Sequence, residues 1–143
     1  MNPQDQARKI IAEMFANDAF SQWLGIEQVD AGPGSSVLRM QVRPDMLNGF
    51  GIAHGGITYA LADSALAFSS NSRGRKAVSL DTSINHLAPV KAGDWLTATA
   101  TEDHIGHKTA VYRVEVRNQD GKMVALFKGT VYRSSQEWGG IGE

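Results

Sequence analysis

The feature that most constrains the fold is an apolar segment with a single charge, Ile57 to about Phe68. Small and apolar residues recur in it at helical spacing, which predicts a helix. Its core-facing stripe comprises Ile57, Ala60, Leu61, Ser64, Ala65 and Phe68, and a second stripe comprises Gly56, Tyr59, Asp63 and Ala67. A helix that is apolar on nearly every side is buried on nearly every side. Other elements must therefore enclose this one.

The remaining segments predict one leading helix and a sheet. Ala7, Ile10, Ile11, Met14 and Phe15 repeat at helical spacing, which indicates an amphipathic helix that ends near residues 17–18. Two strands flank a turn at 32–34, and Pro44 ends the second strand. A basic loop at 71–76 follows the central helix, and four strand-like stretches come after it: 77–87, 94–105, 112–118 and 123–133. Their short connections imply antiparallel pairing.

These elements predict an α+β fold, with one antiparallel sheet of five or six strands around one central helix and an extra N-terminal helix. We expect one domain over residues 1–143, of which 134–143 form a loose tail. A single sheet still has a second face and two edges to protect. Self-association is the simplest way to cover them, so we expect a dimer or a tetramer built from two dimers.

Composition excludes several functions. Apolar residues make up 42% and charged residues 20% of the chain, as in soluble globular proteins. The net charge of -1 gives no basic excess to hold a phosphate backbone, so no nucleic-acid partner is expected. The absence of cysteine removes disulfides, thiolate nucleophiles and cysteine-based zinc sites. No signal-peptide core and no run of about 18 apolar residues occurs, which predicts a cytoplasmic protein with no membrane partner.

Asp63 needs an explanation because a buried carboxylate is costly unless it is paired or hydrogen-bonded. It either pairs with an arginine or caps a backbone group, or it has a shifted pKa and acts as a general base or nucleophile. The helix begins at His54-Gly55-Gly56, where glycines leave the first N–H groups uncovered. Such donors can hold a negative oxygen, although the same glycines also suit a flexible turn without a ligand.

The spacing of these two features predicts a shared site. Gly55 and Asp63 are eight residues apart in the sequence. That separates them by about 12 Å along one helix, so one carbonyl group cannot reach both. If both act on the same substrate, they come from different subunits, and the site lies at a dimer seam in two equivalent copies.

Five motifs resemble the hotdog-fold acyl-CoA thioesterases, and more closely the phenylacetic-acid-degradation thioesterases. They are MLNG (46–49), HGG (54–56), LAD (61–63), PVKAGD (89–94) and NQDGKMVALFKG (118–129). The resemblance extends from the first helix to residue 133. It implies a hotdog fold and hydrolysis of acyl-CoA thioesters to free acid and coenzyme A, without cofactor or metal. Phenylacetyl-CoA and its ring-hydroxylated relatives are the substrates it implies.

The resemblance also implies roles for individual residues. The Gly55 N–H polarises the thioester carbonyl, and Asn48 helps to place that carbonyl or the loop. Asp63 of the partner subunit activates water or attacks directly. Ser79 helps to hold the water, unless it lies on a solvated or interface face. His54 shapes the turn and contacts the substrate.

Substrate-binding residues are less specific. Phe50, Ile52 and Tyr59 allow an aromatic acyl group, although they are also ordinary core residues, and Gly56 is expected to contact the substrate or coenzyme A. Four basic residues could contact the phosphates of coenzyme A: Arg73, Arg75, Lys76 and Lys108. The alternative is that all four are ordinary solvated surface charges.

Other interpretations of the motifs are weaker. GFGIAHGG resembles a dinucleotide-binding loop, but His54 stands where that loop requires glycine. His104 and His107 have metal-ligand spacing, but they fall in a predicted turn without cysteine nearby. A non-catalytic acyl-CoA-binding or regulatory hotdog module would be favoured by the loss of Asp63, which is present. A hydratase on the same fold would bring a different Asp/His pair, which we do not find.

Overall fold

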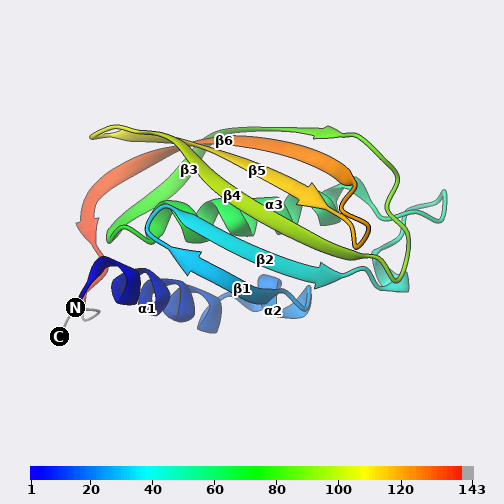
Figure 1. Ribbon diagram of the computed structural model, residues 1–143, viewed down its shortest axis with the longest axis horizontal. Helices are drawn as coiled ribbons and strands as arrows, with labels where there is room; N and C mark the ends of the chain where they lie inside the picture. The colour runs from blue at the N-terminus through cyan, green and yellow to red at the C-terminus, as the bar shows by residue number, and fades with distance from the viewer. Residues whose placement is uncertain (140–143) are drawn as a thin grey trace.

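The computed structural model describes residues 1–139, which form a six-stranded sheet curved around a central helix (Figure 1). The elements in chain order are α1 (Pro3–Ala16), α2 (Ala19–Trp23), β1 (Glu27–Gly32), β2 (Ser35–Gln41), the 3₁₀ helix η1 (Pro44–Met46), α3 (Gly55–Asn71), β3 (Arg75–His86), β4 (Trp95–Ile105), β5 (Thr109–Arg117) and β6 (Met123–Glu137). The strand order is β1-β2-β4-β5-β6-β3, and every neighbouring pair is antiparallel. The predicted α+β class and strand number are confirmed.

Helix α3 is the centre of the core, as its apolar sequence predicts. It packs against β2, β3, β4, β5 and β6, and α1 covers part of its remaining surface. Leu61, Leu66 and Phe68 are fully buried among residues of the concave sheet face such as Tyr112. Gly129 of β6 allows the closest approach, because a Cβ atom there would lie 2.6 Å from Leu66 Cδ2. A glycine in the strand therefore lets helix and sheet meet without strain.

The outward side of strand β5 is largely polar. Alternation in β5 points Val114 and Val116 into the core and leaves Arg113 and Glu115 outside. Arg113 lies 3.9 Å from Glu115 and 3.6 Å from Asp103 in ion pairs on this face. Such a polar strand face is stable in water without a covering partner. The tetramer stays a prediction.

Strand β3 lies at an edge of the sheet and is paired on one side, with β6. It runs from Arg75 to His86, and its Val78 and Leu80 side chains are 64% and 62% exposed. A long edge strand with exposed apolar side chains is a surface suited to pairing with another strand. The alternating sequence predicted this strand but not its position at the edge.

Some element boundaries differ from the prediction. Helix α3 extends beyond 57–68 at both ends, because His54 caps its first turn and the helix continues to Asn71. Strand β3 begins at Arg75, so the predicted loop at 71–76 is shorter. Helix α2 was not predicted; the Asp18 carboxylate begins it by accepting a hydrogen bond from the Ser21 N–H at 2.9 Å.

The expected loose tail at 134–143 is wrong for its first part. Strand β6 continues to Glu137, which pairs with Arg75 of β3 after a shift in register, and the Trp138 N–H donates to the Gly74 carbonyl at 2.9 Å. Pairing with the β3 edge orders this segment although its sequence is polar. Residues 140–143 of the expected tail lie outside the described residues. Within residues 1–139, no helix is both long and apolar enough to cross a membrane.

Candidate active site

The first turn of α3 forms one half of the candidate site. His54 caps the helix: its Nδ1 accepts from the Gly56 N–H at 2.9 Å, and its carbonyl accepts from the Ile57 N–H at 2.9 Å. The Gly55 N–H has no acceptor within residues 1–139. One donor is thus left uncovered at the positive end of the helix dipole, as an oxyanion-binding position requires.

Asn48 organises the loop that precedes the helix. Its Oδ1 accepts from the Phe50 N–H at 2.9 Å and from the Ile52 N–H at 3.4 Å. Because Oδ1 is used by the loop, Nδ2 is the end that can donate to a ligand. Asn48 and Gly55 line the same cavity of about 350 Å³. The structure therefore brings these two sequence-predicted residues together.

His86 belongs to the same half-site and was missed by sequence reasoning. It ends β3 and lines the cavity with Asn48 and Gly55. Its Nε2 lies 3.1 Å from the point where a Cβ atom on Gly55 would stand. A side chain at position 55 would therefore press on the imidazole. Nothing in the strand pattern distinguishes His86 from its neighbours, because its meeting with Gly55 depends on how α3 lies along β3.

Asp63 and Ser79 form the other half-site. Asp63 is half-buried two turns along α3, and burial, followed by the negative charge of Asp18, raises its pKa above the usual range. Within residues 1–139 its carboxylate has no arginine partner and caps no backbone group. Ser79 of β3 lines the same cavity of about 430 Å³. The alternative explanation of Asp63 as an ion-pairing or capping residue therefore has no support.

Tyr59 lies midway between the two half-sites. Its hydroxyl hydrogen-bonds to Thr82 Oγ1 at 2.7 Å, and its ring packs edge-on against Phe127 with centroids 5.4 Å apart. It lines a further cavity with Gly56 and Asp63. Tyr59 and Gly56 are therefore adjacent to the candidate site, and their role beside an acyl group stays a prediction.

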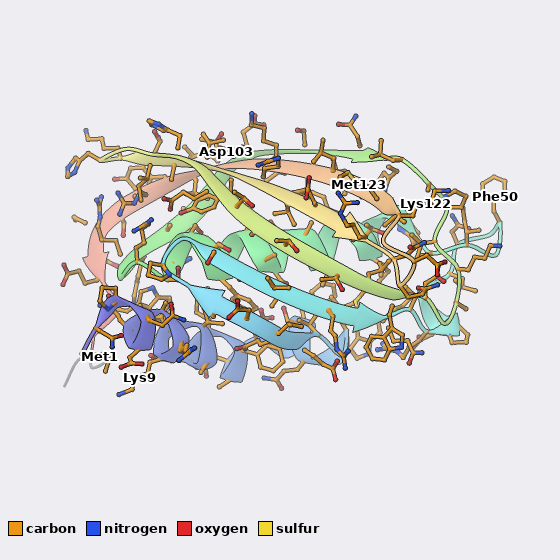
Figure 2. The ribbon with its side chains drawn as sticks, in the orientation of Figure 1. Met1, Lys9, Phe50, Asp103, Lys122 and Met123 are labelled. Carbon is orange, nitrogen blue, oxygen red and sulfur yellow. The ribbon has the colours of Figure 1, made fainter. Side chains whose placement is uncertain are left out.

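Phe50 lies elsewhere. Its side chain is 91% exposed, and Figure 2 shows it at the tip of the loop, pointing away from the helix and the sheet. Within one chain it does not approach Asp63, so its role beside an acyl group stays a prediction.

The basic residues have mixed surroundings. Arg73 donates two hydrogen bonds to the Glu102 carboxylate at 2.9 and 2.8 Å. Arg75 donates to three backbone carbonyls in β6 and the turn before β5. Lys76 lines the cavity beside Asp63, and Lys108 is exposed in the turn before β5. Because both guanidinium groups already have partners, contacts of Arg73 and Arg75 with coenzyme A have no support here and stay predictions.

In this fold a helix is held inside one curved antiparallel sheet. The helix has an uncovered amide at its start and a half-buried carboxylate two turns later. Together, these features define the class of hotdog-fold thioesterases. Residues 50–125 match the family model of the thioesterase superfamily. The chain belongs to this superfamily.

Its relatives cover most of the chain. Acyl-coenzyme A thioesterase PaaI of Escherichia coli K12 is 45% identical over 120 residues, which are 84% of this chain and 86% of that protein. The solved structure of the E. coli PaaI protein from the phenylacetic acid degradation operon has a TM-score of 0.93 and 40% identity, and covers 95% of this chain and 99% of that one. A hypothetical thioesterase from Streptococcus pneumoniae TIGR4, solved with coenzyme A, has a TM-score of 0.82 and 32% identity, over 88% and 98% of the chains.

Proposed function

We propose that this acyl-CoA thioesterase hydrolyses its substrates at a site shared by two subunits. Thioesterase activity follows from membership of the superfamily and from 45% identity to acyl-CoA thioesterase PaaI. The shared site rests on one observation. The uncovered Gly55 N–H and the unpaired Asp63 carboxylate lie on the same helix, eight residues apart and therefore separated by about 12 Å.

The chemistry uses these groups in one sequence. The Gly55 N–H, with Asn48 Nδ2 as a second donor, holds the carbonyl oxygen as it becomes an oxyanion. Asp63 of the partner subunit takes a proton from water while the water oxygen bonds to the carbonyl carbon, and the Ser79 hydroxyl orients that water. The intermediate then breaks its C–S bond, coenzyme A leaves as the thiolate, and the proton returns to sulfur.

The packing of α3 along β3 supports the shared site. The two elements run in opposite directions: Gly55 lies beside His86, and Tyr59 hydrogen-bonds to Thr82. Further along, Asp63 and Ser79 line the same cavity. Tyr59 is midway between Gly55 and Asp63 in sequence. A two-fold axis near Thr82 would pair β3 with β3 of a second copy. That pairing would bring Asp63 of one chain close to Gly55 of the other. The exposed apolar edge of β3 is suited to that pairing.

For the substrate we propose phenylacetyl-CoA and its ring-hydroxylated forms. The support is the likeness to a protein from the phenylacetic acid degradation operon. The test measures free thiol released from phenylacetyl-CoA, hydroxyphenylacetyl-CoA, acetyl-CoA and decanoyl-CoA. We expect the highest kcat/KM for the aryl substrates. Equal or higher kcat/KM for acetyl-CoA and decanoyl-CoA would reject the proposed substrate class. Binding of these acyl-CoAs without turnover of a single one would indicate a non-catalytic module.

The pH dependence tests the role of Asp63. Because burial and Asp18 raise its pKa, the carboxylate is protonated at a higher pH than an ordinary aspartate. We expect kcat/KM to fall with decreasing pH along a limb set by this raised pKa. Asp18→Asn should shift this limb to lower pH. The shift should be smaller than the whole elevation of the Asp63 pKa, because burial is the larger cause of that elevation. Asparagine still caps α2, so the variant should fold. A limb unmoved by this variant would contradict the electrostatic link.

A further inference from the structure

The structure assigns Trp138 and Met14 as the residues that limit the size of the acyl group, because they close an apolar pocket beside Asp63. This inference rests on the proposed function, since the pocket receives the acyl group only if Asp63 directs water at its carbonyl carbon. The pocket has a volume of about 430 Å³, within the range of small-molecule sites. Both residues lie outside the segment 50–125 that matches the superfamily.

The pocket walls come from four elements. The C-terminal half of α3, the start of β3, Val131 of β6 and Met14 of α1 line the pocket, together with Trp138, which follows β6 directly. The apolar lining includes Met14, Leu66, Ala67, Val78, Val131 and Trp138. Asp63 and Ser79 also line this pocket. When the thioester carbonyl lies next to the water that these two residues hold, the acyl group can extend directly along the apolar wall.

The polar side chain beside Trp138 is already satisfied. Asn71 Nδ2 donates to the carbonyls of Ala67 and Ala77 at 2.8 and 3.1 Å. Its Oδ1 accepts from the Ala77 N–H at 3.0 Å and from Trp138 Nε1–H at 3.1 Å. These four bonds use the whole hydrogen-bonding capacity of the amide. The Asn71 amide therefore has no free donor or acceptor with which to bind a polar acyl group.

Three interactions fix the indole of Trp138 in the wall. Its Nε1–H donates to Asn71, its backbone N–H donates to the Gly74 carbonyl at 2.9 Å, and Lys76 Nζ lies 5.1 Å from the ring centroid. The last contact is a cation–π interaction. The half-buried ring, held at both its backbone and its edge, therefore forms part of the pocket wall. An acyl group longer than the pocket therefore meets the indole.

The test compares acyl length preference in Trp138→Ala and the wild type. Thiol release is measured with acetyl-, hexanoyl-, decanoyl- and phenylacetyl-CoA. We expect Trp138→Ala to raise the ratio of kcat/KM for decanoyl-CoA to that for hexanoyl-CoA by at least about tenfold, because removal of the ring opens the pocket. Trp138→Phe keeps a ring in the wall and should retain the wild-type ratio more closely. Trp95→Ala is the matched control, since Trp95 stacks with Arg39 away from this pocket and should leave the ratio unchanged.

A binding measurement gives an independent result. In a Trp23→Phe, Trp95→Phe variant, Trp138 is the one remaining tryptophan. Its fluorescence should change with S-hexyl-CoA, a thioether that cannot be hydrolysed, and not with coenzyme A alone. If Trp138→Ala does not fold, Met14→Ala opens the part of the wall that α1 contributes and should change the ratio in the same direction.

The outcomes separate this inference from the proposed function. An unchanged length preference in folded Trp138→Ala and Met14→Ala, while the wild type hydrolyses the panel, would overturn the size limit alone. A fluorescence response equal for coenzyme A and S-hexyl-CoA would overturn it as well. Absence of thiol release by the wild type would instead reject the proposed function.

Discussion

Asp63→Ala and Asp63→Asn are expected to lower kcat for thioester hydrolysis by about 10²–10⁴-fold, the contribution typical of a general base. KM should change little, because the proposed role of Asp63 is to act on water rather than to bind coenzyme A. The asparagine variant is the sharper of the two, since it keeps the shape of the side chain and removes only the charge. Thiol release under saturating substrate measures the effect.

The same variants should affect stability in the opposite direction. The folded state raises the pKa of Asp63, so it favours the neutral carboxyl, and that stability is present at low pH and lost as pH rises through the folded-state pKa. At neutral pH the ionised carboxylate is therefore a cost to folding, and Asp63→Asn should raise the Tm. A variant that is more stable and inactive would indicate a group retained for chemistry. Unchanged turnover in both variants would reject Asp63 as base and as nucleophile.

Mixing two inactive variants is expected to restore activity if the site is shared. Gly55→Val should lower kcat by about 10²–10³-fold, because its side chain displaces His86 and covers the oxyanion donor. A mixed dimer of Gly55→Val and Asp63→Ala holds one site with both defects and one with neither. Random assembly makes half of the dimers mixed, with one intact site of two, so about a quarter of wild-type activity should return.

Co-expression of the two variants with different affinity tags isolates the mixed dimer, which should show about half of wild-type activity because one of its two sites is intact. The control is each variant co-expressed with itself, which should remain inactive. If both groups act from the same chain, each site in the mixed dimer carries one defect and no activity returns. An active monomer in sedimentation at assay concentration would also contradict the shared site.

Local sequence patterns predicted most of the fold. The apolar helix, the amphipathic first helix and the alternating strands are all short-range signals, because side chains a few residues apart share a face. Element ends were less predictable. The Asp18 cap that begins α2 and the pairing that extends β6 to Glu137 depend on single hydrogen bonds or on a neighbouring strand.

By itself, the sequence determined the buried helix, the glycine start and the eight-residue spacing of Gly55 and Asp63, because helical geometry converts residue number directly into distance. Only the tertiary structure decided which groups surround them. His86 meets Gly55 from a strand that ends 31 residues later, and Trp138 reaches Asn71 across 67 residues. The position of β3 at the sheet edge is equally non-local. Such contacts depend on how the elements pack, and no periodicity along the chain records them.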